Sequence, residues 1–270
     1  MTLLQLENIL GDLRAFAQLV PRTFLHVDEL MDERRTTVGT EQTELRNNWF
    51  YTADGNLYHL RGASATPMLS VTRAKDNLIL RHLLDAENNA FDQLVLNHNY
   101  RADKAEALAV IGAPETITVD LTQLRLQGSD KEWRYLEIST AKPSMFSKGC
   151  EKLNSQERTL AERVYGQGTF FAANMKMLHE ANINNTRIFV LNPEYVRSRA
   201  AEGPIGRASW LRYFYNVSNF GADGRNINLH YRLRGVVVGE ARSAAAPKNA
   251  VPSAATAPSE GVPGPLLERY

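Results

Sequence analysis

Residues 207–236 read RASWLRYFYNVSNFGADGRNINLHYRLRGV, and the part from Arg212 to Tyr231 differs in composition from the rest of the chain. This part holds three Tyr and four Asn, together with Ser, Gly, Asp and His, whereas Lys, Glu, Gln, Met and Trp are missing from it. It has neither the helical nor the strand periodicity that would bury one of its faces. Tyrosine supplies a large contact area at low entropy cost, and Asn, Ser and Gly supply adaptable hydrogen bonds. The composition is therefore typical of a binding loop.

Apolar residues recur along the same segment, separated by positions that are chemically unrelated to one another. These anchors are Trp210, Leu211, Phe214, Phe220, Ala222, Ile227 and Leu233. A segment that is anchored so often is held rigid, and rigid presentation lowers the entropy cost of binding. The alternative is an irregular surface loop that binds nothing, with its Tyr and Phe side chains filling local gaps.

The bulk properties exclude several classes of protein. The chain has 270 residues and a formal net charge of +1, so no strong field attracts it to nucleic acid or to an anionic membrane. Its single cysteine, Cys150, rules out an intrachain disulfide. The first twenty residues lack a basic start and carry Glu7 and Asp12, so we expect no signal peptide. We also expect no membrane span, and hence a soluble protein that is cytoplasmic or virion-associated.

Helical and strand patterns alternate along the chain and predict an α+β fold. Helical spacing predicts helices at residues 3–20, 27–35, 83–94, 155–166 and 170–183. Residues 49–52 and 57–60 are expected to form a hairpin through Asp54-Gly55-Asn56. The run at 107–127 is interpreted as strands broken at Gly112-Ala113-Pro114. Further strands are predicted at residues 68–71, 78–80, 133–138, 187–191 and 232–239.

The run RASWL–x2–F–x3–S–x–F–x–A–x2–R–x–I–x4–RLRGV, preceded by IG and LNPEYV, resembles the C-terminal variable region of diversity-generating retroelement target proteins. Residues 152–183, KLNSQERTLAERVYGQGTFFAANMKMLHEANI, resemble the scaffold of the same proteins. In that family, an error-prone reverse transcriptase rewrites adenines in selected Asn codons, and the products have a C-type-lectin-like fold. Codons diversified in this way never encode Lys, Glu, Gln, Met or Trp, the five residues that are missing from 212–231.

The resemblance implies two sets of residues within 207–236. The diversified, ligand-binding positions would be Arg212, Tyr213, Tyr215, Asn216, Val217, Asn219, Gly221, Asp223, Gly224, Asn226, Asn228, Leu229, His230 and Tyr231. The scaffold positions would be Arg207, Ser209, Trp210, Phe214, Ser218, Phe220, Arg225, Arg232, Arg234 and Gly235. It further implies a non-catalytic protein that binds a macromolecule, most simply a protein, without cofactor or metal. Family members act on phage tails or at cell surfaces.

These inferences predict four regions along the chain. An N-terminal helical region covers 1–45 and a β-rich region covers 46–130. A C-type-lectin-like domain, with two helices around a twisted antiparallel sheet, covers 131–240 and includes the variable segment. Residues 241–270 are rich in Ala, Pro and Ser, and are expected to be disordered because they hold few large apolar groups.

Two other functions remain open at this point. Cys150 and His179 could serve as a thiol nucleophile and its base, as in a formylglycine-generating-like enzyme or another enzyme that also uses Asp223. Alternatively, the protein could be a structural component of a virion or another assembly. In that case the apolar spacing at 6, 10, 13, 17 and 20 would favour a homo-oligomer formed through residues 3–20, although the same helix could simply pack on its own domain.

Three further motifs are interpreted as structural. Asn192-Pro193-Glu194 reverses the order of the calcium-binding Glu-Pro-Asn of lectins and lacks accompanying carboxylates, so it predicts a turn. The six histidines show no metal-ligand spacing. Arg207, Arg225, Arg232 and Arg234 are expected to make structural hydrogen bonds rather than to form a nucleic-acid patch.

Overall fold

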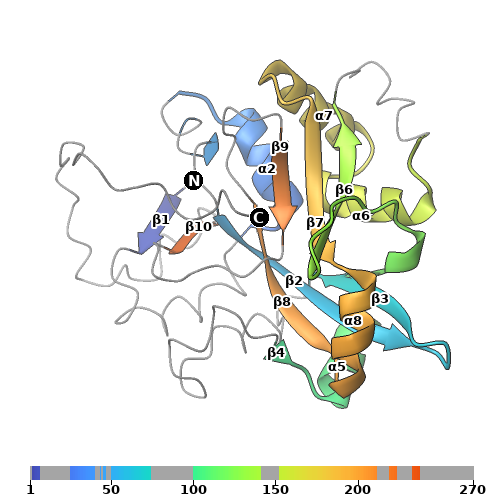
Figure 1. The fold of residues 1–270 in the computed structure, drawn as a ribbon. Helices are drawn as coiled ribbons and strands as arrows, with labels where there is room; N and C mark the ends of the chain where they lie inside the picture. Colours follow the sequence, from blue (N-terminus) through green and yellow to red (C-terminus); the bar gives the residue numbers. More distant parts are fainter. Residues whose placement is uncertain are drawn as a thin grey trace, which may run out of the picture. The chain divides into compact units, whose positions relative to one another are not determined.

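The computed structural model describes residues 2–6, 25–39, 43, 45–46, 50–73, 100–140, 152–211, 219–223 and 233–237 (Figure 1). Residue contacts group 1–238 into one compact unit. Its helices are α2 (Val27–Thr36), α5 (Lys104–Gly112), α6 (Ser155–Tyr165), α7 (Thr169–Glu180) and α8 (Pro193–Arg199), with short 3-10 turns at Leu121–Gln123 and Ala200–Glu202. Its strands are β1 (Thr2–Leu6), β2 (Phe50–Arg61), β3 (Thr66–Thr72), β4 (Tyr100–Arg101), β5 (Ile117–Asp120), β6 (Trp133–Ser139), β7 (Asn185–Leu191), β8 (Ile205–Leu211), β9 (Asn219–Asp223) and β10 (Leu233–Val237).

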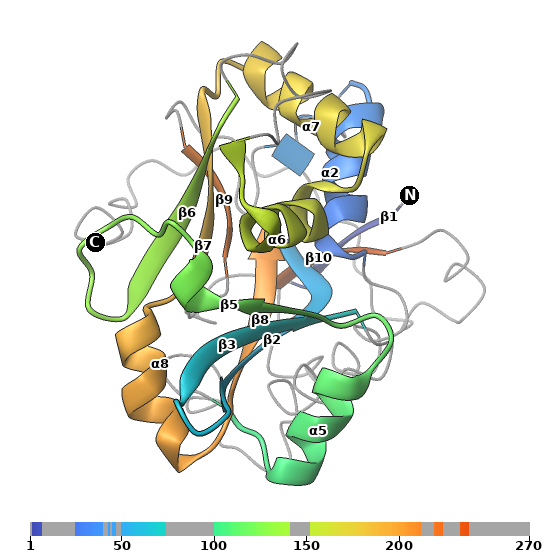
Figure 2. The same ribbon diagram turned by 90° about the vertical axis from the view of Figure 1, so that its right-hand side faces the viewer.

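These strands form one sheet whose main order is β1-β10-β2-β8-β9-β7-β6. Beside this path, β3 pairs with β2 and β5, and β4 pairs with β8. Most pairs are antiparallel, whereas β10–β2 and β7–β9 are parallel. Figures 1 and 2 both show β9, β7 and β6 as neighbours. Strand β9, which lies inside the predicted variable segment, is therefore an interior strand with β8 on one side and β7 on the other.

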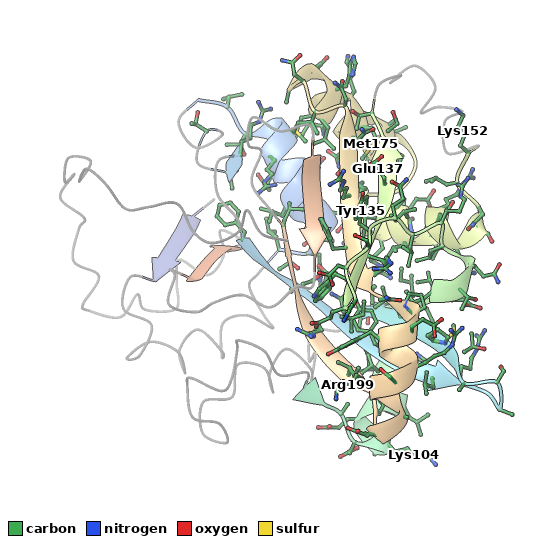
Figure 3. The ribbon with its side chains drawn as sticks, in the orientation of Figure 1. Lys104, Tyr135, Glu137, Lys152, Met175 and Arg199 are labelled. Carbon is green, nitrogen blue, oxygen red and sulfur yellow. The ribbon has the colours of Figure 1, made fainter. Side chains whose placement is uncertain are left out.

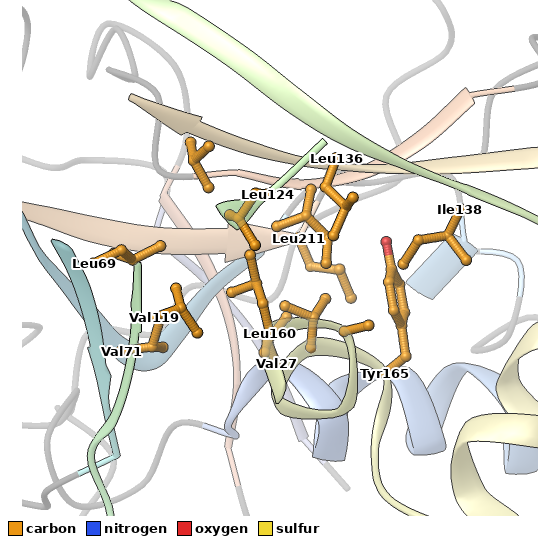
Figure 4. Packing of buried hydrophobic residues seen from close by; sticks show 14 of the residues in the cluster. Val27, Leu69, Val71, Val119, Leu124, Leu136, Ile138, Leu160, Tyr165 and Leu211 are labelled. Carbon is orange, nitrogen blue, oxygen red and sulfur yellow. The ribbon is translucent and has the colours of Figure 1, made fainter. Parts of the chain in front are cut away.

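The main core lies between one face of this sheet and helices α2, α6 and α7 (Figure 4). Apolar side chains recur every three or four residues along these helices, so each helix presents one apolar stripe. From the helices the core takes Leu30, Met31, Leu160, Val164, Phe171, Met175 and Leu178, and from the sheet Phe50, Leu136, Ile138, Ile188, Val190 and Leu211. A smaller cluster joins Leu57 of β2 to Ala107 and Val110 of α5.

The structure confirms the helices predicted around α2, α6 and α7 and the strands predicted around β3, β6, β7 and β10. Helix α6 illustrates why these predictions succeed. Asn154 caps its N-terminus by accepting a hydrogen bond from the Glu157 N–H, and the Glu157 side chain accepts one from the Asn154 N–H. Gly166 ends the helix with a positive φ of 85°. The elements predicted at 78–80 and 83–94 lie outside the described residues.

The predicted helix at 3–20 is wrong where the structure describes it. Thr2–Leu6 is strand β1, and it pairs antiparallel with β10 from Thr2↔Val237 to Leu6↔Leu233. The short apolar run at this end of the chain fits a strand as well as a helix, and pairing with a distant segment decides between them. Residues 7–20 lie outside the described part.

The hairpin predicted within residues 49–60 is also wrong, because Phe50–Arg61 is a single strand. Asp54 and Asn56, interpreted as turn residues, are buried inside it. Asp54 accepts a hydrogen bond from the Val27 N–H at 2.7 Å, and the pairing of β2 with β8 shifts register between Tyr51 and Gly55. Asp54 therefore lies at an irregularity within the strand, whereas Asn56 pairs regularly with Arg207. The actual turn follows Arg61, where Gly62 and Ala65 have positive φ angles.

Residues 104–112 form helix α5, where broken strands were predicted. A capping box between Asp103 and Glu106 begins this helix, and the apolar run behind it gave no clear helical period. The prediction that 212–231 has no strand is wrong as well, since Asn219–Asp223 is β9. Strands β7 and β8 pair with this segment on its two sides, and their pairing stabilises a strand that the local composition does not favour.

The region limits that we predict from the sequence stay predictions. Strands β2 and β3, from the predicted β-rich region 46–130, share one sheet with β7, β8 and β9. The predicted disordered tail, 241–270, lies outside the described residues.

Candidate functional site

The predicted recognition segment begins where β8 ends and continues through β9 towards β10. Three of its predicted ligand-binding positions, Asn219, Gly221 and Asp223, lie in β9. The remaining ones lie outside the described residues: Arg212, Tyr213, Tyr215, Asn216, Val217, Gly224, Asn226, Asn228, Leu229, His230 and Tyr231. Among the predicted scaffold positions, Arg207, Ser209 and Trp210 lie in β8, Phe220 in β9, and Arg234 and Gly235 in β10, whereas Phe214, Ser218, Arg225 and Arg232 lie outside the described part.

One row of directly paired residues crosses the sheet at the core. Phe50 pairs with Leu211, and Leu211 pairs with Ala222. The row then continues from Ala222 to Ile188 and from Ile188 to Leu136. Phe50, Leu211, Ile188 and Leu136 are all buried. Directly paired residues share a face of a sheet, so position 222 belongs to the core-facing row.

The adjacent rows belong to the opposite face, which we call the outer face. Asp223 pairs with Phe189 and Phe189 with Tyr135, while Gly221 pairs with Arg187 and Arg187 with Glu137. Burial alternates strictly along the first six residues of β7: Asn185, Arg187 and Phe189 are half-buried, and the residues between them are buried. Because Asn219, Gly221 and Asp223 pair with those three half-buried residues, the register assigns them to the outer face.

Side chains of β6 and β7 form a connected cluster on the outer face, defined here as Tyr135, Glu137, Arg187 and Phe189. The rings of Tyr135 and Phe189 lie with their centroids 5.6 Å apart. The Arg187 guanidinium lies over the Tyr135 ring, 4.2 Å from its centroid, and its Nε donates a hydrogen bond to Glu137 at 3.1 Å. Figure 3 marks Tyr135 and Glu137 along β6. These four residues are not among the predicted site residues, although the alternation of residues within both predicted strands is a signal for a shared face.

Arg207 and Ser209 of β8, the predicted scaffold residues whose burial the structure describes, are both buried. Arg207 is 3% exposed, donates a hydrogen bond to Glu132 at 2.7 Å, and lies over the Trp133 ring. Burial lowers the pKa of Arg207 from its ordinary value, and the nearby Glu132 carboxylate opposes that shift. The hydroxyl of Ser209 accepts a hydrogen bond from Asn56 at 3.3 Å. Arg207 is thus a structural residue, in agreement with its sequence interpretation.

The residues considered for other chemistry have structural roles or cannot be placed. Asn192 caps α8 by accepting the Glu194 N–H and donates to the Lys131 carbonyl oxygen, while Glu194 pairs with Arg197. Within the described part, no three His, Cys, Asp or Glu residues are grouped so as to hold a metal ion. Cys150 lies outside that part.

A small cavity lies in the core, bordered by Val27, Asn56, Tyr58, Leu160 and Ser209 among others. Its volume of about 20 Å³ suits a single water molecule rather than an organic ligand. Among the described helices, none has the length and apolar character needed to cross a membrane.

Comparison with known proteins gives one structural similarity. No family model matches the sequence, and no curated protein matches it. A solved structure, described as the accommodation of massive sequence variation in Nanoarchaeota by the C-type lectin fold, matches with a TM-score of 0.54. The match covers 87% of this chain and 96% of the other, at 16% identity. This chain has a C-type lectin fold.

The C-type lectin fold is the one that the resemblance at residues 152–183 and 207–236 implied, so this expectation is confirmed. The similarity also extends well beyond residues 131–240, because it covers 87% of the chain. Within this C-type lectin fold, helices α2, α6 and α7 cover the core-facing side of the sheet, and β9 contributes three predicted ligand-binding positions to the outer face.

Proposed function

We propose that this chain is a non-catalytic ligand-binding protein whose diversified recognition surface is built from residues 212–231 and binds a protein target. The main support for the proposal is the face of the sheet to which each residue of β9 belongs. Positions 219, 221 and 223, which the resemblance assigns to the diversified set, pair with half-buried residues of β7. Phe220 and Ala222, the anchors between them, pair with the buried residues Thr186 and Ile188. Variable positions therefore pair with half-buried residues of β7, and anchor positions pair with buried ones.

The fold gives this proposal further support. The similar solved structure is described as a C-type lectin fold that accommodates massive sequence variation. In a sheet that helices cover on one face, the residues on the other face can change while the core stays the same. This is possible because successive residues of a strand point to opposite faces of the sheet. Tyr213, Tyr215 and Tyr231 would supply aromatic contact area, and Asn216, Asn219, Asn228 and His230 would supply hydrogen bonds to the target.

The origin of the surface can be tested in the gene. We expect a near-copy of the segment that encodes residues 207–236 to lie close to this gene, beside a reverse-transcriptase gene. The two copies should differ at positions where the repeat has adenine and hardly anywhere else. Differences spread evenly over all four bases would contradict diversification by this route.

The display function can be tested with two matched variants of the same segment. Replacing Tyr213, Asn219 and Tyr231 together by Ser should lower the free energy of unfolding by no more than about 0.5 kcal/mol per position. The control variant, Arg207→Ser, should lose about 2 kcal/mol or more, because it removes a buried charged hydrogen bond to Glu132. Chemical denaturation measures both. If the triple variant is destabilised as strongly as the control, residues 212–231 are part of the core and the proposal is wrong.

A further inference from the structure

Strands β6 and β7 place unvarying side chains beside the diversified ones. The cluster of Tyr135, Glu137, Arg187 and Phe189 lies outside residues 207–236, so diversification of that segment leaves it unchanged. Two of its members are directly paired with predicted variable positions: Arg187 with Gly221 and Phe189 with Asp223. Paired positions in neighbouring strands are about 5 Å apart, so a ligand seated on position 221 or 223 also reaches β7.

Arg187 is held in place before any ligand arrives. Its guanidinium lies over the Tyr135 ring at 4.2 Å, and its Nε is hydrogen-bonded to Glu137 at 3.1 Å. The side chains of Arg187 and Glu137 are nevertheless 25% and 23% exposed. A guanidinium fixed in this way loses little rotamer freedom on binding, and Arg and Tyr are enriched among residues that dominate binding energy. Gly221, the register partner of Arg187 in β9, has no side chain to cover it.

The charges around Arg187 indicate which kind of hydrogen-bond acceptor on a ligand the guanidinium would bind. Glu137 is the hydrogen-bond partner of Arg187 within the described part, and it uses only Nε of the five N–H donors of a guanidinium. Glu137 already balances the positive charge, so a second carboxylate would face repulsion from the first. A neutral acceptor, such as a main-chain carbonyl oxygen, avoids this repulsion. The neighbouring Tyr135 ring offers apolar contact area, and the half-buried Phe189 ring, which also packs against the main core, supports it from β7.

We infer that Tyr135 and Arg187, with Phe189 packed beneath them, form a constant part of the recognition surface, which contacts a main-chain carbonyl group and adjacent apolar side chains of a protein target. This inference rests on the proposed function. The constant cluster recognises features that protein targets share, whereas the diversified positions of 212–231 distinguish one target from another. Arg187 provides the directional contact in those versions of the chain that keep a small residue at position 221.

The test uses a library of the full chain, diversified at thirteen of the fourteen positions predicted to vary, with Gly221 kept, and selected against purified lysozyme, serum albumin and ferritin. Each independent binder then receives Arg187→Ala, Arg187→Lys or the control Arg197→Ala. Arg197 is also exposed and ion-paired, but lies in α8 with Glu194 as its partner. Surface plasmon resonance measures Kd, and thermal melting measures folding. Arg187→Lys retains the charge and most of the stem, so it reports on binding even if the alanine variant does not fold.

We expect Arg187→Ala to weaken most binders about tenfold or more, and Arg187→Lys to weaken them measurably, because lysine lacks the planar fork. Arg197→Ala should leave every Kd within about twofold. If neither Arg187 variant changes Kd while the binders still depend on the diversified positions, the inference is wrong and the proposed function stands. If the library stays folded but yields no binders to any of the three proteins, the proposed function itself fails.

Discussion

At the scale of single residues, a few buried polar groups hold the connections between elements. Glu157 is fully buried at the start of α6 and accepts hydrogen bonds from the backbone N–H and the Nε of Arg125, both at 2.8 Å, and from the Asn154 N–H. Burial alone would raise the pKa of Glu157, but the hydrogen bonds from Arg125 and Asn154 outweigh it, so the pKa lies below its ordinary value of 4.5. This carboxylate therefore ties α6 to the segment after β5.

Replacing Glu157 by Gln should lower the free energy of unfolding by about 1–3 kcal/mol at neutral pH, because an ionised acceptor with several donors is lost. Since the pKa of Glu157 is depressed by folding, its contribution is complete above pH 4.5 and is lost as the pH falls through the folded-state pKa. The difference between the two proteins should therefore shrink in acid. Glu180→Gln is the control, because Glu180 is an exposed member of a surface pair with Lys176 and should cost less than about 1 kcal/mol.

His59 predicts a second pH effect. It is buried in β2, with its Nε2 3.0 Å from the Ser70 hydroxyl, and burial lowers its pKa below the ordinary value of 6.5. The neutral imidazole is favoured in the folded state, so its contribution to stability is complete above pH 6.5 and declines as the pH falls towards the folded-state pKa. Denaturation of His59→Gln should show a flatter pH dependence between neutral and mildly acid pH. Equal slopes for both proteins would exclude a contribution from this residue.

At the scale of elements, the register of the short strand β9 is specified by its two neighbouring strands, β7 and β8. It pairs antiparallel with β8 through Trp210↔Asp223 and Leu211↔Ala222, and parallel with β7 over all five of its residues. A shift of one residue would exchange the two faces of β9 and bring Gly221 and Asp223 into the core row. The buried row through Leu211 and Ile188 specifies the register, because only small or apolar residues fit there.

Ala222→Asp should therefore lower the free energy of unfolding by about 2–4 kcal/mol, since it would place an unpaired carboxylate in the buried row between Leu211 and Ile188. The matched change one residue later, Asp223→Ala, should alter it by less than about 1 kcal/mol. Urea denaturation of the two variants under the same conditions gives the comparison. Similar losses in both would mean that the assigned register is wrong.

At the scale of the whole molecule, the sheet joins segments that are far apart in the chain. Strand β1 pairs with β10, β2 pairs with β8, and the parallel partners β7 and β9 are separated by α8 and β8. Such pairing is non-local, so the sheet forms only when most of the chain has collapsed. Strand β1 covers β10, which would otherwise form an edge of the main sheet path.

Removal of residues 1–6 should consequently expose the open hydrogen-bonding edge of β10. We expect a lower melting temperature and a larger mass in solution, because an uncovered edge strand pairs with other chains. Light scattering on the full chain and the shortened chain measures this effect. If residues 3–20 instead drove self-association, as their helical spacing predicts, a chain lacking residues 1–20 would have a smaller mass in solution than the full chain.

The sequence by itself determined the elements whose signals are local. Asn154, Glu157 and Gly166 delimit α6, and alternation predicts β6 and β7, because caps and periodicity act within a few residues. The resemblance across 207–236 also led to the C-type lectin fold. Tertiary structure alone decided that residues 2–6 pair with β10, that Asp54 lies within a strand, and that β9 exists. In each of these cases the deciding partner is distant in the chain, and the pairing or burial that it provides outweighs local preference.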